Sequence, residues 1–222
     1  MHLTSDGRRR AGLLLSILTV LALIGLALVV LALISTVAIT AQQPSTDGPK
    51  YTSAGELVRP DDYREWVYVT SGLGMTYGPA QPATGRPPMF DNVFVNRQSY
   101  RQFITTGKWP DKTMFLLEIR RGEENVSINN GGRTQGEMVA LEAAVKDETR
   151  FPDTAWKYFD LGGGPTAKST AAPLPTSASC YTCHKNNTAV EWTFVQFYPT
   201  LFEVAKQMGT VKPTYDPGRK PQ

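Results

Sequence analysis

Residues 113–120, with the sequence TMFLLEIR, alternate between two kinds of side chain in a way that decides the fold class. Phe115, Leu117 and Ile119 share one face, while Glu118 and Arg120 fall on the other, which is the period of two expected for a β-strand. Aromatic and β-branched runs predict further strands over residues 65–69, 92–95, 138–146 and 156–161. The Ala and Glu content of residues 138–146 would equally permit a helix. The pattern therefore predicts a mainly β (α+β) fold, in which an antiparallel sheet is accompanied by a few helices.

Three helices are expected beside the sheet. The first covers residues 97–106, where the chain is polar, periodic and closed by a glycine. The second is short and follows Ser177 or Ser179, either of which could act as its N-cap. The third covers residues 191–208, an amphipathic stretch that is interrupted at Pro199.

The N-terminal part of the chain has the composition of a membrane segment. Residues 11–46 contain no charged side chain, and residues 12–39 are almost unbroken Leu, Ala, Val and Ile. That run exceeds the roughly 20 residues that cross a bilayer as a helix, so we expect a transmembrane anchor at 12–39. The arginines at 8–10 then keep residues 1–11 in the cytoplasm and place the rest on the outer, periplasmic side of a bacterial membrane. A cleaved signal peptide with a poor site at 38–41 and a twin-arginine export signal are the alternatives.

About 180 residues follow the anchor, which is enough for one domain with a sizeable core. Residues 40–56, rich in Pro, Ser, Thr and Gly, predict a flexible tether, and residues 209–222 predict a loose tail. The folded domain is therefore expected over residues 57–208. The net charge of +3 includes the three arginines at 8–10, so no basic patch for nucleic acid is expected.

The sequence CYTCH at residues 180–184 is the strongest chemical motif of the chain. Cys180 and Cys183 have the spacing at which two thiols attach covalently to one haem, and the adjacent His184 then binds the iron. These are the only two cysteines, so we expect one haem c near the C-terminus. In bacteria c-type haem is attached outside the cytoplasmic membrane, where the predicted topology places the motif. A disulfide or redox dithiol is an alternative, as is zinc, although the only other histidine is His2.

The sixth position of the iron has no histidine available, since His2 is predicted to lie on the cytoplasmic side of the anchor. A methionine sulfur remains a candidate, and each methionine is also an ordinary core or loop residue. The alternative is an open position, at which haem iron binds small molecules such as nitric oxide. The candidate methionines are Met75, Met89, Met114, Met138 and Met208.

Several segments together resemble the cytochrome P-460 family over roughly residues 57–208. They are Glu142 with residues 145–147, residues 150–151, Trp156, residues 158–159, the motif at 180–184, and FVQFYPTL at 194–201. The resemblance implies a β-rich, exported, usually dimeric mono-haem c protein. It also implies either oxidation of hydroxylamine or, in the related β-type cytochromes c′, binding of nitric oxide in an apolar pocket.

The resemblance implies roles for two residues of the predicted sheet. Leu117 aligns with a lysine that is cross-linked to the haem in hydroxylamine-oxidising members, and leucine cannot form that bond. The nearest lysine, Lys112, has the opposite strand parity. Glu142 aligns with a carboxylate that moves protons in the distal pocket, and a general base at that position suits N–H or O–H deprotonation. The alternative is that Glu142 pairs with Lys146 or Arg120 on a solvated face.

Phe115 shares strand parity with Leu117 and is the best candidate for a cap over the distal face of the haem. Phe90, Phe94 and Phe103 are further candidates, and each of these side chains is also an ordinary core residue. The haem-contacting residues are therefore expected to be Cys180, Cys183, His184, Phe115 and Leu117.

These residues leave three alternative functions. The first is a haem-dependent oxidoreductase that acts on hydroxylamine or nitric oxide, with Glu142 as catalytic residue and an exported redox partner such as a soluble cytochrome. The second is a gas binder without turnover, and the third is electron transfer with a methionine ligand. A homodimer is implied by the resemblance alone.

Overall fold

The computed structural model of the 222-residue chain describes residues 21–23, 47–76 and 87–218. The chain divides into two units, residues 1–44 and 45–222. In the first unit only residues 21–23 are described, and they are helical. The expected anchor at 12–39 otherwise lies outside the described residues. Within the described ranges, no helix has both the length and the apolarity to span a bilayer.

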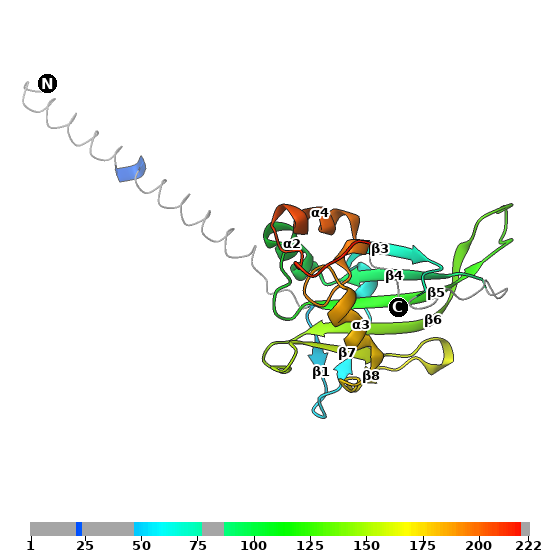
Figure 1. Ribbon diagram of the computed structural model, residues 1–222, viewed down its shortest axis with the longest axis horizontal. Coiled ribbons are helices and arrows are strands. Elements are labelled where there is room, and N and C mark those ends of the chain that lie inside the picture. Colours follow the sequence, from blue (N-terminus) through cyan, green and yellow to red (C-terminus); the bar gives the residue numbers. More distant parts are fainter. Residues whose placement is uncertain (1–20, 24–46, 77–86, 219–222) are drawn as a thin grey trace, which may run out of the picture. The chain divides into compact units, whose positions relative to one another are not determined.

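The second unit is built on a five-stranded antiparallel sheet with the order β3-β4-β5-β6-β7 (Figure 1). Each strand neighbours the next one in sequence, so the sheet is a simple meander. The prediction of a mainly β fold with an antiparallel sheet and a few helices is confirmed. The strands are β3 (Val67–Leu73), β4 (Met89–Val95), β5 (Met114–Glu123), β6 (Thr134–Lys146) and β7 (Trp156–Asp160).

Smaller elements surround this sheet. A three-stranded sheet has the order β1-β2-β8. Its strands are β1 (Lys50–Tyr51), β2 (Leu57–Val58) and β8 (Thr170–Ala171). The α-helices of the second unit are α2 (Arg97–Thr106), α3 (Ser179–Asn187) and α4 (Pro199–Gln207), and the 3-10 helices are η1 (Tyr63–Glu65), η2 (Gly164–Thr166) and η3 (Val195–Phe197).

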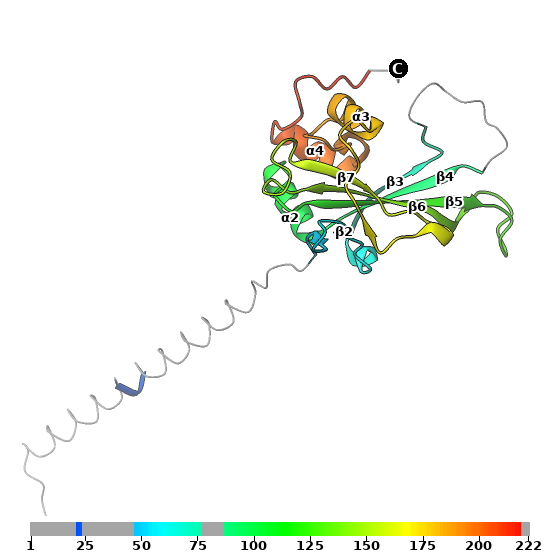
Figure 2. The same ribbon diagram turned by 90° about the horizontal axis from the view of Figure 1, so that it is seen from below.

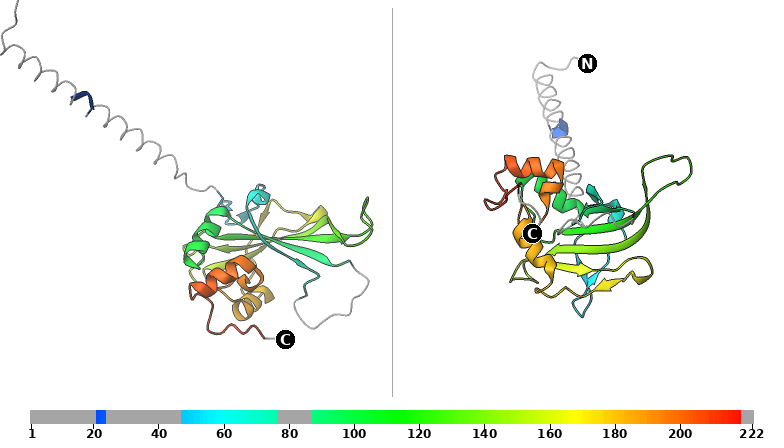
Figure 3. Two further views of the ribbon diagram at one scale, coloured as in Figure 1. Left: turned by 90° about the horizontal axis from the view of Figure 1, so that it is seen from above. Right: turned by 45° about the vertical axis from the view of Figure 1, so that its right-hand side comes forward.

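Both faces of the large sheet are covered. Seen from the edge in Figures 2 and 3, α3 and α4 lie on one side and β2 on the other. On the β2 side, Met114, Leu116 and Leu141 pack with Leu57 in one core. On the helix side, Phe115 belongs to a second core that also holds residues of α2 and α4. The period of two along β5 therefore places alternate side chains in two different cores. Residues 138–146, for which the sequence permitted either a strand or a helix, are part of strand β6.

Two helix predictions near the C-terminus are corrected. Residues 191–208 do not form one helix, because α4 begins only at Pro199, where the missing N–H and fixed φ suit a first turn. Ahead of it, Thr193 forms an isolated bridge with Val190. The N-cap of α3 is Ala178, without a side-chain cap bond, so neither predicted serine caps this helix.

The expected tether and tail are shorter than residues 40–56 and 209–222. In the described part of the tether, buried Asp47 accepts a 2.7 Å hydrogen bond from the N–H of Arg97, which ties the chain to the start of α2. In the tail, the Lys212 N–H donates to Ala189, and Tyr215 packs edge-on against Phe202. A hydrogen bond at one end and an aromatic contact at the other thus extend the folded domain beyond 57–208.

Candidate functional site

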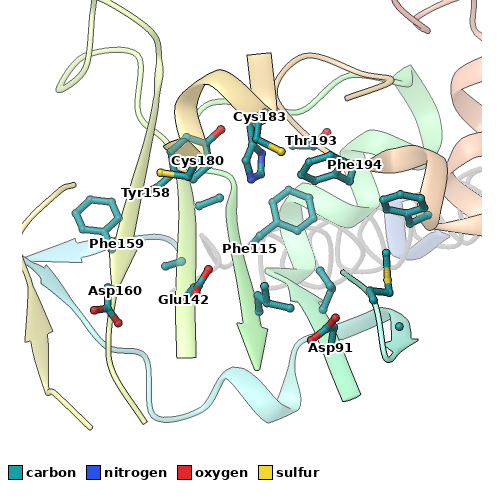
Figure 4. A pocket seen from close by; sticks show the side chains of 18 of the residues that line it. Asp91, Phe115, Glu142, Tyr158, Phe159, Asp160, Cys180, Cys183, Thr193 and Phe194 are labelled. Atoms are coloured by element: carbon teal, nitrogen blue, oxygen red, sulfur yellow. The ribbon is translucent and has the colours of Figure 1, made fainter. Parts of the chain in front are cut away.

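A cavity of about 530 Å³ lies between the helix side of the large sheet and the segments that carry α3 and η3 (Figure 4). Its size falls within the range of about 300–1,000 Å³ that is usual for ligand pockets. Side chains of mostly apolar character line it, and they come from β3 to β7 on one side and from residues 174–198 on the other.

One row of residues crosses the sheet at the floor of this cavity. Strand register pairs Thr70 with Val93, Val93 with Leu117, Leu117 with Glu142, and Glu142 with Asp160. All five line the cavity. The antiparallel ladder thus brings together five residues that span 91 positions of sequence.

Cys180 and Cys183 reach the cavity from α3. They are three residues apart on the helix and therefore share a face, and both thiols are free and line the cavity (Figure 4). Burial raises the pKa of the Cys180 thiol. A redox-active dithiol needs the opposite shift, so the environment does not favour that alternative. The described ranges contain no group of three or more His, Cys, Asp or Glu residues arranged to hold a metal ion such as zinc.

His184 is oriented by its backbone partner. Its Nδ1 lies 2.7 Å from the carbonyl oxygen of Trp192, so Nδ1 carries the hydrogen and Nε2 is left as an electron-pair donor. The ring is packed between Tyr158 and Phe194, with centroids 4.4 and 4.6 Å away. Burial lowers the pKa of His184 to about 4. The imidazole is therefore neutral at physiological pH, which is the form that binds iron.

These residues fit a haem. The thiols and the oriented imidazole line one mostly apolar cavity. Tyr158 lines the same cavity, and its hydroxyl is buried without a hydrogen-bond partner among the described residues, which is rare unless a ligand or water supplies one. Haem in this cavity would supply an iron centre that binds small molecules and exchanges electrons.

Glu142 faces the cavity and does not form the alternative ion pair with Lys146 or Arg120 on a solvated face. Its carboxylate makes no hydrogen bond or ion pair within the described residues, and its exposed side chain lines the cavity. The two partners considered from sequence are engaged elsewhere, because Arg120 binds Glu118 at 2.5 Å and Lys146 binds Glu191 at 3.0 Å. Burial among protein atoms, reinforced by the charge of Asp160, raises the pKa of Glu142.

Leu117 occupies the centre of the row, and no lysine of the described ranges lines the cavity. Lys112 lies before β5 in a left-handed conformation, with φ of 65°. Its ammonium binds the carboxylate of Asp147. The lysine nearest in sequence is thus held away from the position at which the resemblance places a cross-link.

The aromatic lining differs in part from the expectation. Phe115 lines the cavity and packs against Trp109 and Tyr198. The other candidates, Phe90, Phe94 and Phe103, are not among the residues that line it. Phe94 belongs to the opposite core, and the ring of Phe103 stacks on Trp109 with centroids 4.0 Å apart. Phe194 and Phe197 line the cavity instead, on the side of the motif.

Among the candidate methionines only Met75 lines the cavity. Met114 and Met138 pack in the core on the β2 side, and Met208 is half exposed after α4. Position in the fold therefore reduces five candidate sulfur ligands to one.

Asp91 and Asp160 also line the cavity, and sequence reasoning missed both. Asp91 lies in the run MFDNVFV with the same parity as Val93, so an acidic residue among inward positions was the available signal. Asp160 is the last residue of β7 and pairs with Glu142, and no local sequence pattern predicts that pairing.

Comparison with known proteins gives one family. The family model described as Cytochrome P460 matches residues 60–195, a span that includes Leu117, Glu142 and the CYTCH motif. No curated protein matches the chain.

Proposed function

Because the chain belongs to the cytochrome P460 family, we propose that it is a mono-haem c-type cytochrome that acts on small nitrogen species at an open iron. The resemblance seen in the sequence is confirmed, and membership makes the protein a haem-binding cytochrome. The observation that carries the finer proposal is the cavity in which Cys180, Cys183 and His184 face a row containing Leu117 and Glu142.

The two cysteines and the histidine of the motif each have one task in this proposal. The thiols of Cys180 and Cys183 hold one haem by thioether bonds, and Nε2 of His184 binds its iron. The hydrogen bond to the Trp192 carbonyl oxygen keeps the imidazole in the required tautomer.

Glu142 is the proton acceptor in the proposal. Its pKa is raised by burial, which brings a carboxylate closer to the pH at which it can both take and release a proton. A hydroxylamine molecule in the cavity would lose its N–H and O–H protons as it is oxidised, and Glu142 is an unpaired carboxylate in the same cavity. Electrons would leave through the haem to an exported partner such as a soluble cytochrome.

Leu117 favours a second candidate, which is binding of nitric oxide without turnover. A leucine and Phe115 make this part of the cavity apolar, and nitric oxide needs neither proton transfer nor a charged partner. Met75 defines a third candidate, electron transfer with sulfur as the sixth ligand, because it is a methionine that lines the cavity.

The location belongs to the same proposal. The uncharged run at 12–39 and the arginines at 8–10 support a single-pass anchor with the haem domain on the periplasmic side, where covalent haem attachment takes place. A homodimer is proposed on the resemblance alone.

One set of spectra tests the proposal. The full-length protein, purified with its haem, should give a pyridine haemochrome of ordinary c type, and its reduced spectrum should change on addition of nitric oxide. Hydroxylamine with an artificial oxidant should be turned over by the parent and more slowly by Glu142→Ala. Nitric oxide binding without turnover would select the second candidate. A low-spin spectrum that ignores added ligands would select the third, and absence of haem would overturn all of them.

A further inference from the structure

Asp91 is a buried carboxylate for which the proposed function has no task. It lies on β4, is only 7% exposed and lines the cavity. Within the described ranges its carboxylate makes neither a hydrogen bond nor an ion pair. In Figure 4, Asp91 and Glu142 lie on the sheet side of the cavity, opposite Cys180 and Cys183. A buried, unpartnered acid is costly to keep, so its position points to a ligand.

Register places the two acids on either side of β5. Asp91 pairs with Ile119, and Glu142 pairs with Leu117, the next residue of β5 on the same face. Neighbouring strands are about 4.8 Å apart, so the backbones of β4 and β6 are separated by about 10 Å at this point. Both carboxylates can therefore act on one small molecule between them.

No positive side chain offsets these acids inside the described cavity. Around Asp91, β3 presents Thr70 and Gly72, β5 presents Leu117, and the segment after β3 presents Met75. Glu142 and Asp160 supply further negative charge, and the latter is paired with Lys168 at 3.4 Å. Arg121 follows Ile119 on the same face of β5 but is not among the residues that line the cavity.

The absence of a partner affects the ionisation of Asp91. Burial, with repulsion from Glu142 in addition, raises the pKa of Asp91 to about 6. Near pH 5 the Asp91 carboxyl is therefore mostly neutral, and near pH 8 it is charged. The charge that a ligand meets in the cavity changes between these two conditions.

We propose that Asp91 and Glu142 together select ligands by charge, admitting uncharged or protonated nitrogen bases of the hydroxylamine kind and rejecting anions. The inference rests on the proposed function, since both carboxylates act on a molecule at the iron. An anion in the cavity meets two unpaired carboxylates, whereas a protonated base or a neutral molecule can donate hydrogen bonds to them.

The test measures ligand affinity and not turnover. The oxidised, haem-loaded full chain is titrated with azide at pH 8 and pH 5, and the reduced protein with nitric oxide as an uncharged ligand. Asp91→Asn should bind azide about tenfold more tightly than the parent at pH 8, the scale expected for removing one nearby charge. The gain should shrink at pH 5, and nitric oxide affinity should stay the same.

Two further variants keep the result interpretable. Glu142→Gln should also gain azide affinity at pH 8. Asp153→Asn removes the same charge from an exposed site that pairs with Lys157, and it should leave azide affinity unchanged. Equal azide affinity in the parent, Asp91→Asn and Glu142→Gln, or an equal gain in Asp153→Asn, would overturn the inference while haem and nitric oxide binding persist. Loss of haem in the parent itself would overturn the proposed function instead.

Discussion

Leu117 and Glu142 are directly opposite one another on β5 and β6, and both side chains border the cavity that also holds the CYTCH motif. Residues paired in this way have their Cβ atoms about 4.5–5.5 Å apart. The residue at position 117 therefore sets the environment of the carboxylate at 142. Leucine leaves that carboxylate unpaired, whereas a cation at 117 would neutralise it.

Leu117→Lys should lower the pKa of Glu142 by about 1–3 units, because an ammonium would stand beside the carboxylate. Infrared or ¹³C NMR titration of the carboxyl group measures this shift. Leu117→Met is the matched control, since it has similar volume and no charge. An unchanged Glu142 titration in Leu117→Lys would contradict the direct pairing. A red-shifted haem band in that variant would show that a lysine at 117 can react with the haem ring.

Cys183→Ala should keep haem attached through Cys180 alone, because the two thiols bind different vinyl groups in the proposal. The pyridine haemochrome should then shift to the position of a haem with one free vinyl group. Removing both thiols should leave no haem after denaturation. Thr182→Ala is the control within the motif, since Thr182 is exposed. Retention of ordinary c-type haem by the double variant would refute attachment at these residues.

Glu118→Ala should destabilise the fold by about 2–4 kcal/mol, because it leaves the buried Tyr63 hydroxyl and the part-buried Arg120 guanidinium without their acceptor. The Glu118 carboxylate is completely buried and binds Tyr63, Arg64 and Arg120. Denaturant unfolding of the parent and the variant at pH 7 measures the difference. Glu124→Ala, at an exposed ion pair with Arg133, should cost less than about 1 kcal/mol.

The same network predicts acid sensitivity. Although burial opposes ionisation of Glu118, its hydrogen bonds and the two arginines prevail and lower its pKa. An acid with a lowered folded pKa stabilises the protein above its unfolded pKa of about 4.3. That contribution is lost as the pH falls from there through the lowered value. The parent should therefore lose more stability than Glu118→Gln between pH 5 and pH 3, and parallel pH profiles would contradict the assignment.

Met75→Leu should leave the haem spectrum unchanged, because the leading proposal has an open sixth position. Met75 lies against Gly72, where an added Cβ would fall 2.2 Å from its sulfur. Gly72→Ala should therefore displace the Met75 side chain without removing it. Met114→Leu, in the opposite core, is the control. A change from low spin to high spin in Met75→Leu and in Gly72→Ala, but not in the control, would establish sulfur ligation.

The local sequence pattern was sufficient to predict secondary structure where a single segment determines it. The alternation in residues 113–120 could be read without any partner segment, and these residues fall almost entirely in β5. The anchor expected from the charge-free run at 12–39 stays a prediction, because only residues 21–23 of that run are described. Helix α2 also ended at the predicted glycine, Gly107, in a left-handed conformation. The expected helix at 191–208 failed because apolar periodicity does not reveal the bridge at Thr193 or the start of α4 at Pro199.

The sequence by itself determined the β-rich class, the two thiols and the imidazole of the motif, and the leucine at 117, because these depend on residue type and short spacing. Only the tertiary structure decided which side chains meet them. Asp91, Glu142 and Asp160 lie on three strands, and strand register brings them to one cavity. Arg120 and Lys146 form ion pairs with Glu118 and Glu191, so neither of them pairs with Glu142. Long-range strand pairing determines both the burial of these carboxylates and the charges around them, and neither can be read from a single segment.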